Sequence, residues 1–146
     1  MRALGGGFIL PAAAAPPGWL RTAGREALLD DEHAREFAGA WVQAWNAHDL
    51  DRIMTHYEDD VVLVSPVAAR ILDDPSGTVS GKAALRSYFQ RGLDVYPNLK
   101  FELLDVMWGL NSVVLYYVNQ KGSRTGEYME FGPTGKVSRV VANYNG

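Results

Sequence analysis

The segment RTGEYMEF, residues 124–131, places an acidic side chain where the pattern of a β-strand predicts an apolar one. Because successive side chains of a strand point to opposite faces, Glu127 shares a face with Met129, the face that we expect to lie in the core. A carboxylate among apolar side chains is costly unless it is paired, protonated or used in chemistry. Burial also raises the pKa of a carboxyl and suits it to proton transfer. Glu127 is therefore our candidate catalytic residue, and the alternative is an ion pair on the next strand with Arg139 or Lys136.

The other titratable side chains give weaker signals for catalysis. Asp105 stands on a predicted strand and is a second candidate for an inward carboxylate. Histidine titrates near neutral pH, but His33 falls at the start of a helix and His48 in a turn, where exposure is the default. His56 ranks first among the three histidines, because the neighbouring Tyr57 should point toward the core.

The sequence lacks the patterns of several common sites. It has no cysteine, which excludes disulfides, zinc–thiolate sites and cysteine nucleophiles. The segment GTVSGKA, residues 77–83, is one residue too short between its glycines for a phosphate loop and ends in Ala83 instead of Ser or Thr. No pair of histidines or carboxylates has the spacing of a metal site. We therefore expect neither a metal nor a cofactor.

Composition describes an ordinary globular protein. The chain of 146 residues suits one domain, and we interpret residues 1–24 as a disordered leader or a non-native extension and residues 25–146 as that domain. The net charge of −3, from 14 basic and 17 acidic residues, disfavours a nucleic-acid-binding role. No stretch approaches the roughly 18 to 20 apolar residues that span a membrane. The absence of cysteine is compatible with the cytoplasm, where we expect the protein.

The apolar pattern predicts helices first and strands afterwards. Helical spacing begins near residue 30 and runs through Trp41, and Asp49 then caps a short second helix whose apolar face ends with Tyr57. Residues 66–80 are predicted to be irregular apart from one short strand. The remaining predicted elements are a strand at 61–65, a helix at 81–93 and four strands at 99–108, 112–120, 124–131 and 136–144.

Helices followed by an antiparallel meander indicate an α+β domain. The strand at 112–120 is apolar on both faces, with Val113 and Leu115 on one and Val114 and Tyr116 on the other. A sheet that faces water on one side alternates more cleanly between apolar and polar residues. We therefore expect a second layer over the outer face, most simply another subunit, and so a homodimer through this face.

Three passages resemble a known superfamily: WVQAWNAHDLDRIMTHYEDDVVLVSPV, GKAALRSYFQRGL and GKVSRVVANY. The chain is similar from Asp30 to Tyr144 to nuclear-transport-factor-two-like proteins, in their SnoaL-like and ketosteroid-isomerase-like branch. The resemblance implies a strongly curved antiparallel sheet of about six strands, wrapped around three helices as a cone with an internal pocket. In this superfamily the open end of the cone commonly takes an apolar small molecule, although the fold hosts many functions.

The resemblance also assigns site residues by position. Ser65 stands where the isomerase has its aspartate base, Trp41 where it has an oxyanion-binding tyrosine, and Glu127 where it keeps a protonated acid. Only one of the three elements is therefore kept as a carboxyl, which makes steroid isomerase activity an unsuitable assignment. For the aromatic residues, simple core packing is the alternative to a ligand contact. The residues that we expect to bind the ligand are Trp41, Tyr57, Ser65, Tyr88, Phe89, Met129, Val140 and Tyr144.

Three hypotheses for the function follow. The first is a domain that binds a mostly apolar, carbonyl-bearing small molecule and acts on it by acid–base chemistry, as an isomerase, a cyclase or a dehydratase. The second is a non-catalytic sensor or carrier with the same pocket, which the loss of the base at Ser65 favours. The third is a dimeric interaction module whose cavity is filled by its own aromatic side chains.

Overall fold

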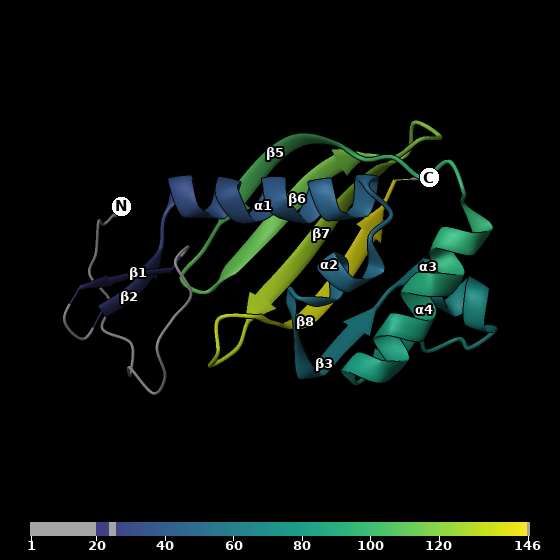
Figure 1. The fold of residues 1–146 in the computed structure, drawn as a ribbon, viewed down its shortest axis with the longest axis horizontal. Helices are drawn as coiled ribbons and strands as arrows, with labels where there is room; N and C mark the ends of the chain where they lie inside the picture. The colour runs from purple at the N-terminus through teal and green to yellow at the C-terminus, as the bar shows by residue number, and fades with distance from the viewer. Residues whose placement is uncertain (1–19, 24–25, 146) are drawn as a thin grey trace.

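The computed structural model describes residues 20–23 and 26–145 (Figure 1). The leader predicted for residues 1–24 lies mostly outside these ranges. Its described part, Leu20–Ala23 (β1), pairs in antiparallel fashion with Glu26–Leu29 (β2) just before the first helix. The interpretation of residues 1–24 as a disordered leader or a non-native extension stays a prediction.

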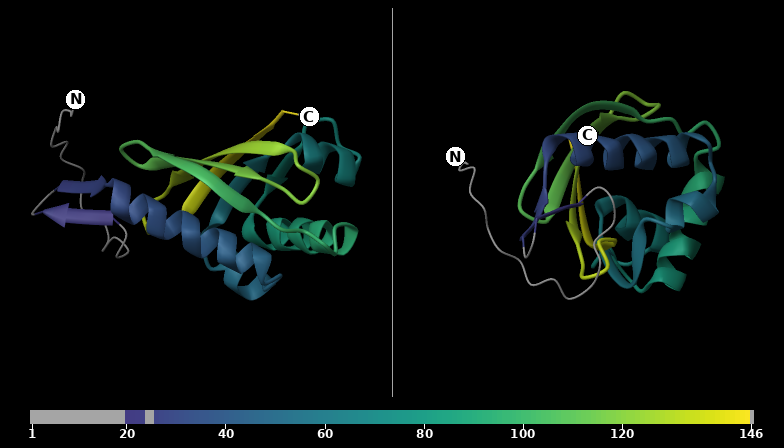
Figure 2. Two further views of the ribbon diagram at one scale, coloured as in Figure 1. Left: turned by 90° about the horizontal axis from the view of Figure 1, so that it is seen from above. Right: turned by 60° about the vertical axis from the view of Figure 1, so that its left-hand side comes forward.

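A curved sheet of six strands forms the body of the described domain (Figures 1 and 2). Its order is β4-β3-β8-β7-β6-β5, and its strands are β3 (Tyr57–Val64), β4 (Thr78–Ser80), β5 (Glu102–Trp108), β6 (Ser112–Val118), β7 (Arg124–Phe131) and β8 (Val137–Tyr144). Strands β5 to β8 are the predicted antiparallel meander. The predicted α+β class is confirmed, but β3 and β8 run parallel. Two helices, β4 and strands β5 to β7 lie between them in the chain, a connection long enough to allow the parallel pairing.

Four helices lie in the described ranges, one more than expected: α1 (Asp31–Asn46), α2 (Leu50–Met54), α3 (Pro66–Leu72) and α4 (Lys82–Val95). The extra helix is α3, in the region predicted to be irregular. The side chain of Ser65 accepts hydrogen bonds from the amides of Val67 and Ala68, and Pro66 occupies the first turn, a strong start signal for a helix. Helix α2 ends at Met54, so Tyr57 belongs to β3 and not to the second helix as predicted.

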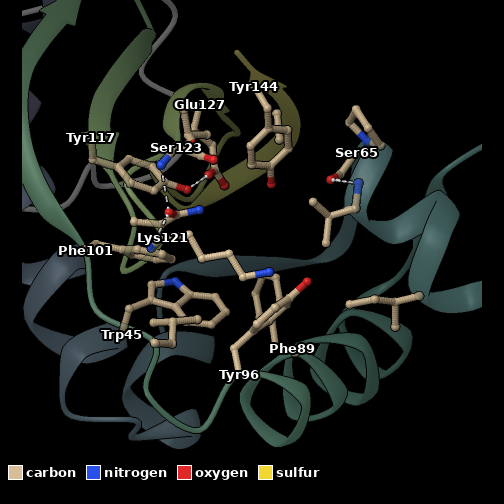
Figure 3. Close-up of a pocket in the computed structure, with 18 of the residues that line it drawn as sticks. Trp45, Ser65, Phe89, Tyr96, Phe101, Tyr117, Lys121, Ser123, Glu127 and Tyr144 are labelled. Carbon is tan, nitrogen blue, oxygen red and sulfur yellow. Dashed lines mark hydrogen bonds between the residues drawn. The ribbon is translucent and has the colours of Figure 1, made fainter. Parts of the chain in front are cut away.

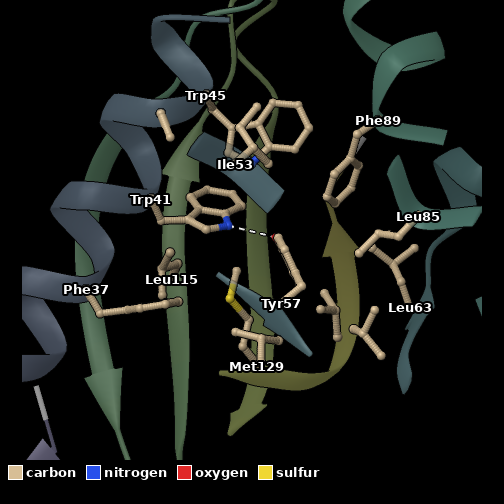
Figure 4. Close-up of a cluster of buried hydrophobic side chains, with 14 of the residues drawn as sticks. Phe37, Trp41, Trp45, Ile53, Tyr57, Leu63, Leu85, Phe89, Leu115 and Met129 are labelled. Carbon is tan, nitrogen blue, oxygen red and sulfur yellow. Dashed lines mark hydrogen bonds between the residues drawn. The ribbon is translucent and has the colours of Figure 1, made fainter. Parts of the chain in front are cut away.

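Helix α1 crosses the concave face of the sheet, and one end of the space between them is filled with apolar side chains (Figure 4). The indole Nε1 of Trp41 donates to the Tyr57 hydroxyl at 2.9 Å, and both residues are buried. Leu115 and Met129 pack beneath them from β6 and β7. This end of the domain is a closed core.

The outer face of the sheet is only half-buried. Burial alternates along β6 and β7, and Val114, Tyr116 and Tyr128 occupy the outer positions. On the edge strand β5, Met107 and Trp108 are exposed. The homodimer through this face stays a prediction. None of the helices in residues 20–23 and 26–145 combines the length and apolar character needed to cross a bilayer.

Candidate active site

The other end of the space between the helices and the sheet is a cavity of about 370 Å³ (Figure 3). Small-molecule sites commonly have volumes of about 300 to 1,000 Å³. The wall of the cavity is rich in aromatic side chains and comes from α1, α3 and α4, the segments beside them, and the sheet. Its aromatic members on the helix side are Trp41, Trp45, Tyr88, Phe89, Tyr96 and Phe101.

Glu127 projects from β7 into this cavity and is 6% exposed. The Tyr117 hydroxyl, on β6, donates to Glu127 Oε1 at 2.5 Å. Ala142 is the partner of Glu127 on β8, and this small side chain also lines the cavity. A tyrosine on one side and an alanine on the other therefore hold the carboxyl while leaving space beside it for a ligand.

Burial raises the pKa of Glu127 to about 7, and the hydrogen bond from Tyr117 offsets part of the rise. Near neutral pH both the acid and the carboxylate are then populated, which suits general acid–base catalysis. The alternative ion pair with Arg139 or Lys136 is wrong. Arg139 is the cross-strand partner of Glu130, and no salt bridge to Glu127 occurs among the described residues.

Three tyrosine hydroxyls beside Glu127 remain protonated at neutral pH. Burial, reinforced by the charge of Glu127, raises the pKa of Tyr88 to about 12 and raises those of Tyr117 and Tyr144 as well. The nearby Ser65 hydroxyl offsets part of the rise in pKa at Tyr88 and Tyr144. Tyr88 and Tyr144 are hydrogen-bond donors for an oxygen in the cavity, whereas Tyr117 already donates to Glu127, and none of the three is a base at neutral pH.

Ser65 lines the cavity but works mainly as a helix cap. Its Oγ accepts from the amides of Val67 at 3.1 Å and Ala68 at 3.4 Å, at the start of α3. With its lone pairs engaged in this way, the hydroxyl offers a ligand its proton. Ser65 can therefore orient an acceptor atom, but it cannot replace a carboxylate base.

Most of the residues predicted to form the site do surround the cavity. They are Trp41, Ser65, Tyr88, Phe89, Glu127 and Tyr144. The structure places Tyr57, Met129 and Val140 in the closed core instead, outside the cavity wall. Trp41 lies between the two ends, and because Tyr57 accepts its indole N–H, that N–H is not free to bind a ligand.

The secondary candidates lie elsewhere. The prediction of an inward Asp105 was wrong: its side chain is 58% exposed. The pairing of β5 with β6 shifts between Leu103 and Asp105, and such a bulge moves the following residues to the opposite face. His56 packs edge-on against Phe37 outside the cavity, and burial followed by the charge of Arg52 lowers its pKa.

Several functional groups of the cavity were not predicted. Tyr117 is the most important, and its shared face with Leu115 was a signal that could have paired it with Glu127 on the adjacent strand. Trp45 Nε1 and Thr125 Oγ1 are buried in the wall without a hydrogen-bond partner. Among residues 20–23 and 26–145, no group of three or more histidine or acidic side chains gathers as a metal site.

Comparison with known proteins agrees with this architecture. The family model of the SnoaL-like domain matches residues 38–143. The chain belongs to this SnoaL-like family. A SnoaL-like protein of unknown function from Burkholderia thailandensis has a solved structure that is similar at 36% identity and a TM-score of 0.78, covering 82% of this chain and 99% of that one. No curated protein matches the chain.

More distant structures share the fold of this SnoaL-like chain. A proposed ketosteroid isomerase from Kribbella flavida aligns at 18% identity with a TM-score of 0.62, covering 79% of each chain. The epoxide hydrolase/cyclase-like enzyme SalBIII, of pyran ring formation in salinomycin, aligns at 18% identity with a TM-score of 0.60, covering 80% of this chain and 93% of that one. At this level of identity the similarity establishes the fold and no activity.

Proposed function

We propose that this SnoaL-like protein binds a small, mostly apolar, carbonyl-bearing molecule in the cavity and acts on it by acid–base chemistry, as an isomerase, a cyclase or a dehydratase. The observation that carries the proposal is the buried carboxyl of Glu127, held by Tyr117 and open to an aromatic cavity. A buried titratable group in a concave apolar site is the arrangement expected of a catalytic acid or base.

Glu127 can serve in both directions of proton transfer. As a carboxylate it takes a proton from the carbon next to the ligand carbonyl. The electron pair of that C–H bond forms a carbon–carbon double bond, and the π pair of the carbonyl moves to its oxygen. The resulting enolate oxygen accepts hydrogen bonds from the hydroxyl donors of the cavity, such as Tyr88 and Tyr144. In a conjugated ligand the protonated Glu127 then delivers the proton to a different carbon of the enolate, which completes an isomerisation with one acid–base group and no cofactor.

A hydrogen-exchange assay tests this step without knowledge of the natural substrate. Cyclic ketones and enones are incubated with the protein in heavy water, and deuterium uptake next to the carbonyl is followed by NMR. We expect Glu127→Gln to slow catalysed exchange by about 100-fold or more, because the amide neither accepts nor gives up the proton. Glu130→Gln is the matched control, since Glu130 lies on the same strand but on the outer face, where Tyr128 donates to it at 2.8 Å.

Exchange that is equally fast in wild type and Glu127→Gln would remove Glu127 from the chemistry. Ligand binding without any exchange would favour the second hypothesis, a sensor or carrier. The capping role of Ser65 supports that candidate, because the position of the isomerase base is occupied by a hydroxyl engaged with backbone amides. The open cavity argues against the third hypothesis, in which aromatic side chains fill the space.

The proposal also includes the oligomeric state of the protein and its cellular compartment. We retain the homodimer through the outer sheet face, supported by the half-buried Val114 and Tyr116 on that face. Size-exclusion chromatography with light scattering gives the mass directly, and a monomer at micromolar concentration would contradict it. We retain the cytoplasm as the compartment, supported by the lack of cysteine.

A further inference from the structure

The rim of the cavity brings together two cations from separate parts of the chain. Arg70, on α3, donates from Nη2 to the Tyr96 hydroxyl at 3.3 Å. Lys121, in the turn between β6 and β7, places Nζ 4.7 Å from the centre of the Tyr96 ring. Both residues line the cavity, and neither forms a salt bridge within the described ranges.

The backbone around Lys121 holds its position. Asn119 Oδ1 accepts from the amide of Lys121 at 2.9 Å and from that of Ser123 at 3.0 Å, and Gly122 has a φ of 86°, which favours glycine. In Figure 3 the Lys121 side chain reaches from this turn toward Tyr96 across the cavity. The turn therefore fixes the backbone from which Lys121 extends, and the contact with Tyr96 places its ammonium group on the rim.

This gathering of positive charge is not a consequence of overall composition. The chain has 17 acidic and 14 basic residues. Among the residues that line the cavity, Arg70 and Lys121 are the cations and Glu127 is the acid. The charged groups thus separate into a cationic rim and a buried carboxyl, with aromatic wall around them.

We infer that the rim binds the carboxylate of the ligand, so that the ligand is an apolar carbonyl compound with a carboxylate at one end. Arg70 and Lys121 would bind the carboxylate, while the apolar body contacts Trp45 and Phe89. The inference rests on the proposed function and narrows its ligand class. It does not depend on turnover, because binding alone tests it.

Two ligands of the same shape, one charged and one neutral, measure how much the negative charge contributes to binding. The probes are 4-benzoylbenzoate, which has two aromatic rings, a ketone and a carboxylate, and its primary amide, which differs in the charged group alone. Affinity is measured by isothermal titration calorimetry. We expect wild type to bind the acid roughly tenfold more tightly than the amide, because two charge-assisted contacts are lost in the amide.

The double variant Arg70→Gln/Lys121→Gln should reduce this preference to about twofold or less, because it weakens binding of the acid more than binding of the amide. Both side chains are exposed, so the fold should persist, and circular dichroism checks it. Lys136→Gln is the control, because Lys136 is exposed on the turn between β7 and β8 and does not line the cavity.

The outcomes separate the two proposals. Equal affinities in wild type, or a preference that survives in the double variant, would overturn the carboxylate subsite while the proposed function stands. A preference for the acid that is kept in Glu127→Gln would support the subsite even if the hydrogen-exchange assay fails. If neither compound binds wild type, both the subsite and the proposed ligand class are contradicted.

Discussion

The two ends of the space between α1 and the sheet contain similar aromatic side chains but different polar pairs. At the closed end, Trp41 Nε1 donates to Tyr57 Oη at 2.9 Å, and neither group titrates near neutral pH. At the open end, Tyr117 Oη donates to Glu127 Oε1 at 2.5 Å. The first pair is neutral and sealed by packing, whereas the second contains an acid and borders a cavity.

This difference separates stability from chemistry within one fold. A neutral, satisfied hydrogen bond in a closed core favours the folded state modestly. A buried carboxyl opposes folding once it is ionised, because burial removes its hydration. The open end therefore holds a group that the fold does not need, at the place where a ligand can reach it.

The largest expected contrast is in packing. Met129→Ala should destabilise the protein by about 2 to 5 kcal/mol, because Met129 is fully buried at the closed end and its removal leaves a void. Ile71→Ala should cost less than half as much, since Ile71 is half-exposed at the rim and its loss only widens an existing cavity. Urea denaturation of both variants gives the two free energies of unfolding. Equal losses would show that the two ends are packed alike.

The next contrast is in how the free energy of unfolding depends on pH. The pKa of Glu127 is raised from 4.5 to about 7 on folding, so the folded state holds this proton more tightly than the unfolded state does. The resulting stability is fully present below pH 4.5 and is lost as the pH rises through 7. Over this window the loss amounts to about 3 kcal/mol, since each pKa unit corresponds to about 1.4 kcal/mol.

Glu127→Gln removes this titration and should reveal it by difference. The variant should gain up to about 3 kcal/mol relative to wild type between about pH 4 and about pH 8, because the amide has no ionised form to bury. Urea denaturation at several pH values measures the difference, with Glu130→Gln as the exposed-face control. A difference that does not change with pH would mean that Glu127 is already ionised in a hydrated environment.

The alternation of side chains along the sequence correctly predicted that Glu127 points inward, because β7 has no bulge near this residue. The pairing of β7 with β8 runs without a shift from Thr125 to Glu130, so the inward face counted along the segment is the inward face of the structure. On β5 the same reasoning failed for Asp105, because a bulge after Leu103 reverses the faces. A bulge depends on the pairing of two strands and has no reliable signal in one of them.

The resemblance to SnoaL-like proteins predicted the curved sheet and most of the cavity wall, but two kinds of detail lay beyond it. Tyr57 was placed on a helix because its spacing continues the apolar face of α2, whereas the helix ends at Met54. The cationic rim depends on how α3 and the turn at Lys121 come to lie against Tyr96. That convergence arises from tertiary packing, and no local pattern encodes it.

The smallest expected effects come from the two tyrosine hydroxyls themselves. Tyr57→Phe should cost about 1 to 2 kcal/mol at every pH, because it leaves the buried indole N–H of Trp41 without its acceptor. Tyr117→Phe should cost about 1 kcal/mol near pH 5 and about 2 kcal/mol near pH 9, because the lost hydrogen bond is stronger to a carboxylate than to a neutral acid.

The measurement is the free energy of unfolding of each variant at the two pH values, and the decisive quantity is how its loss changes between them. A pH-dependent loss in Tyr57→Phe, or a constant loss in Tyr117→Phe, would contradict the distinction between a neutral and an ionisable pair.

The hydrogen bond from Tyr117 also lowers the pKa of Glu127, so its removal should shift any pH profile of hydrogen exchange toward higher pH. Tyr57→Phe should leave that profile in place, because Tyr57 donates nothing to the carboxyl and serves only the closed end.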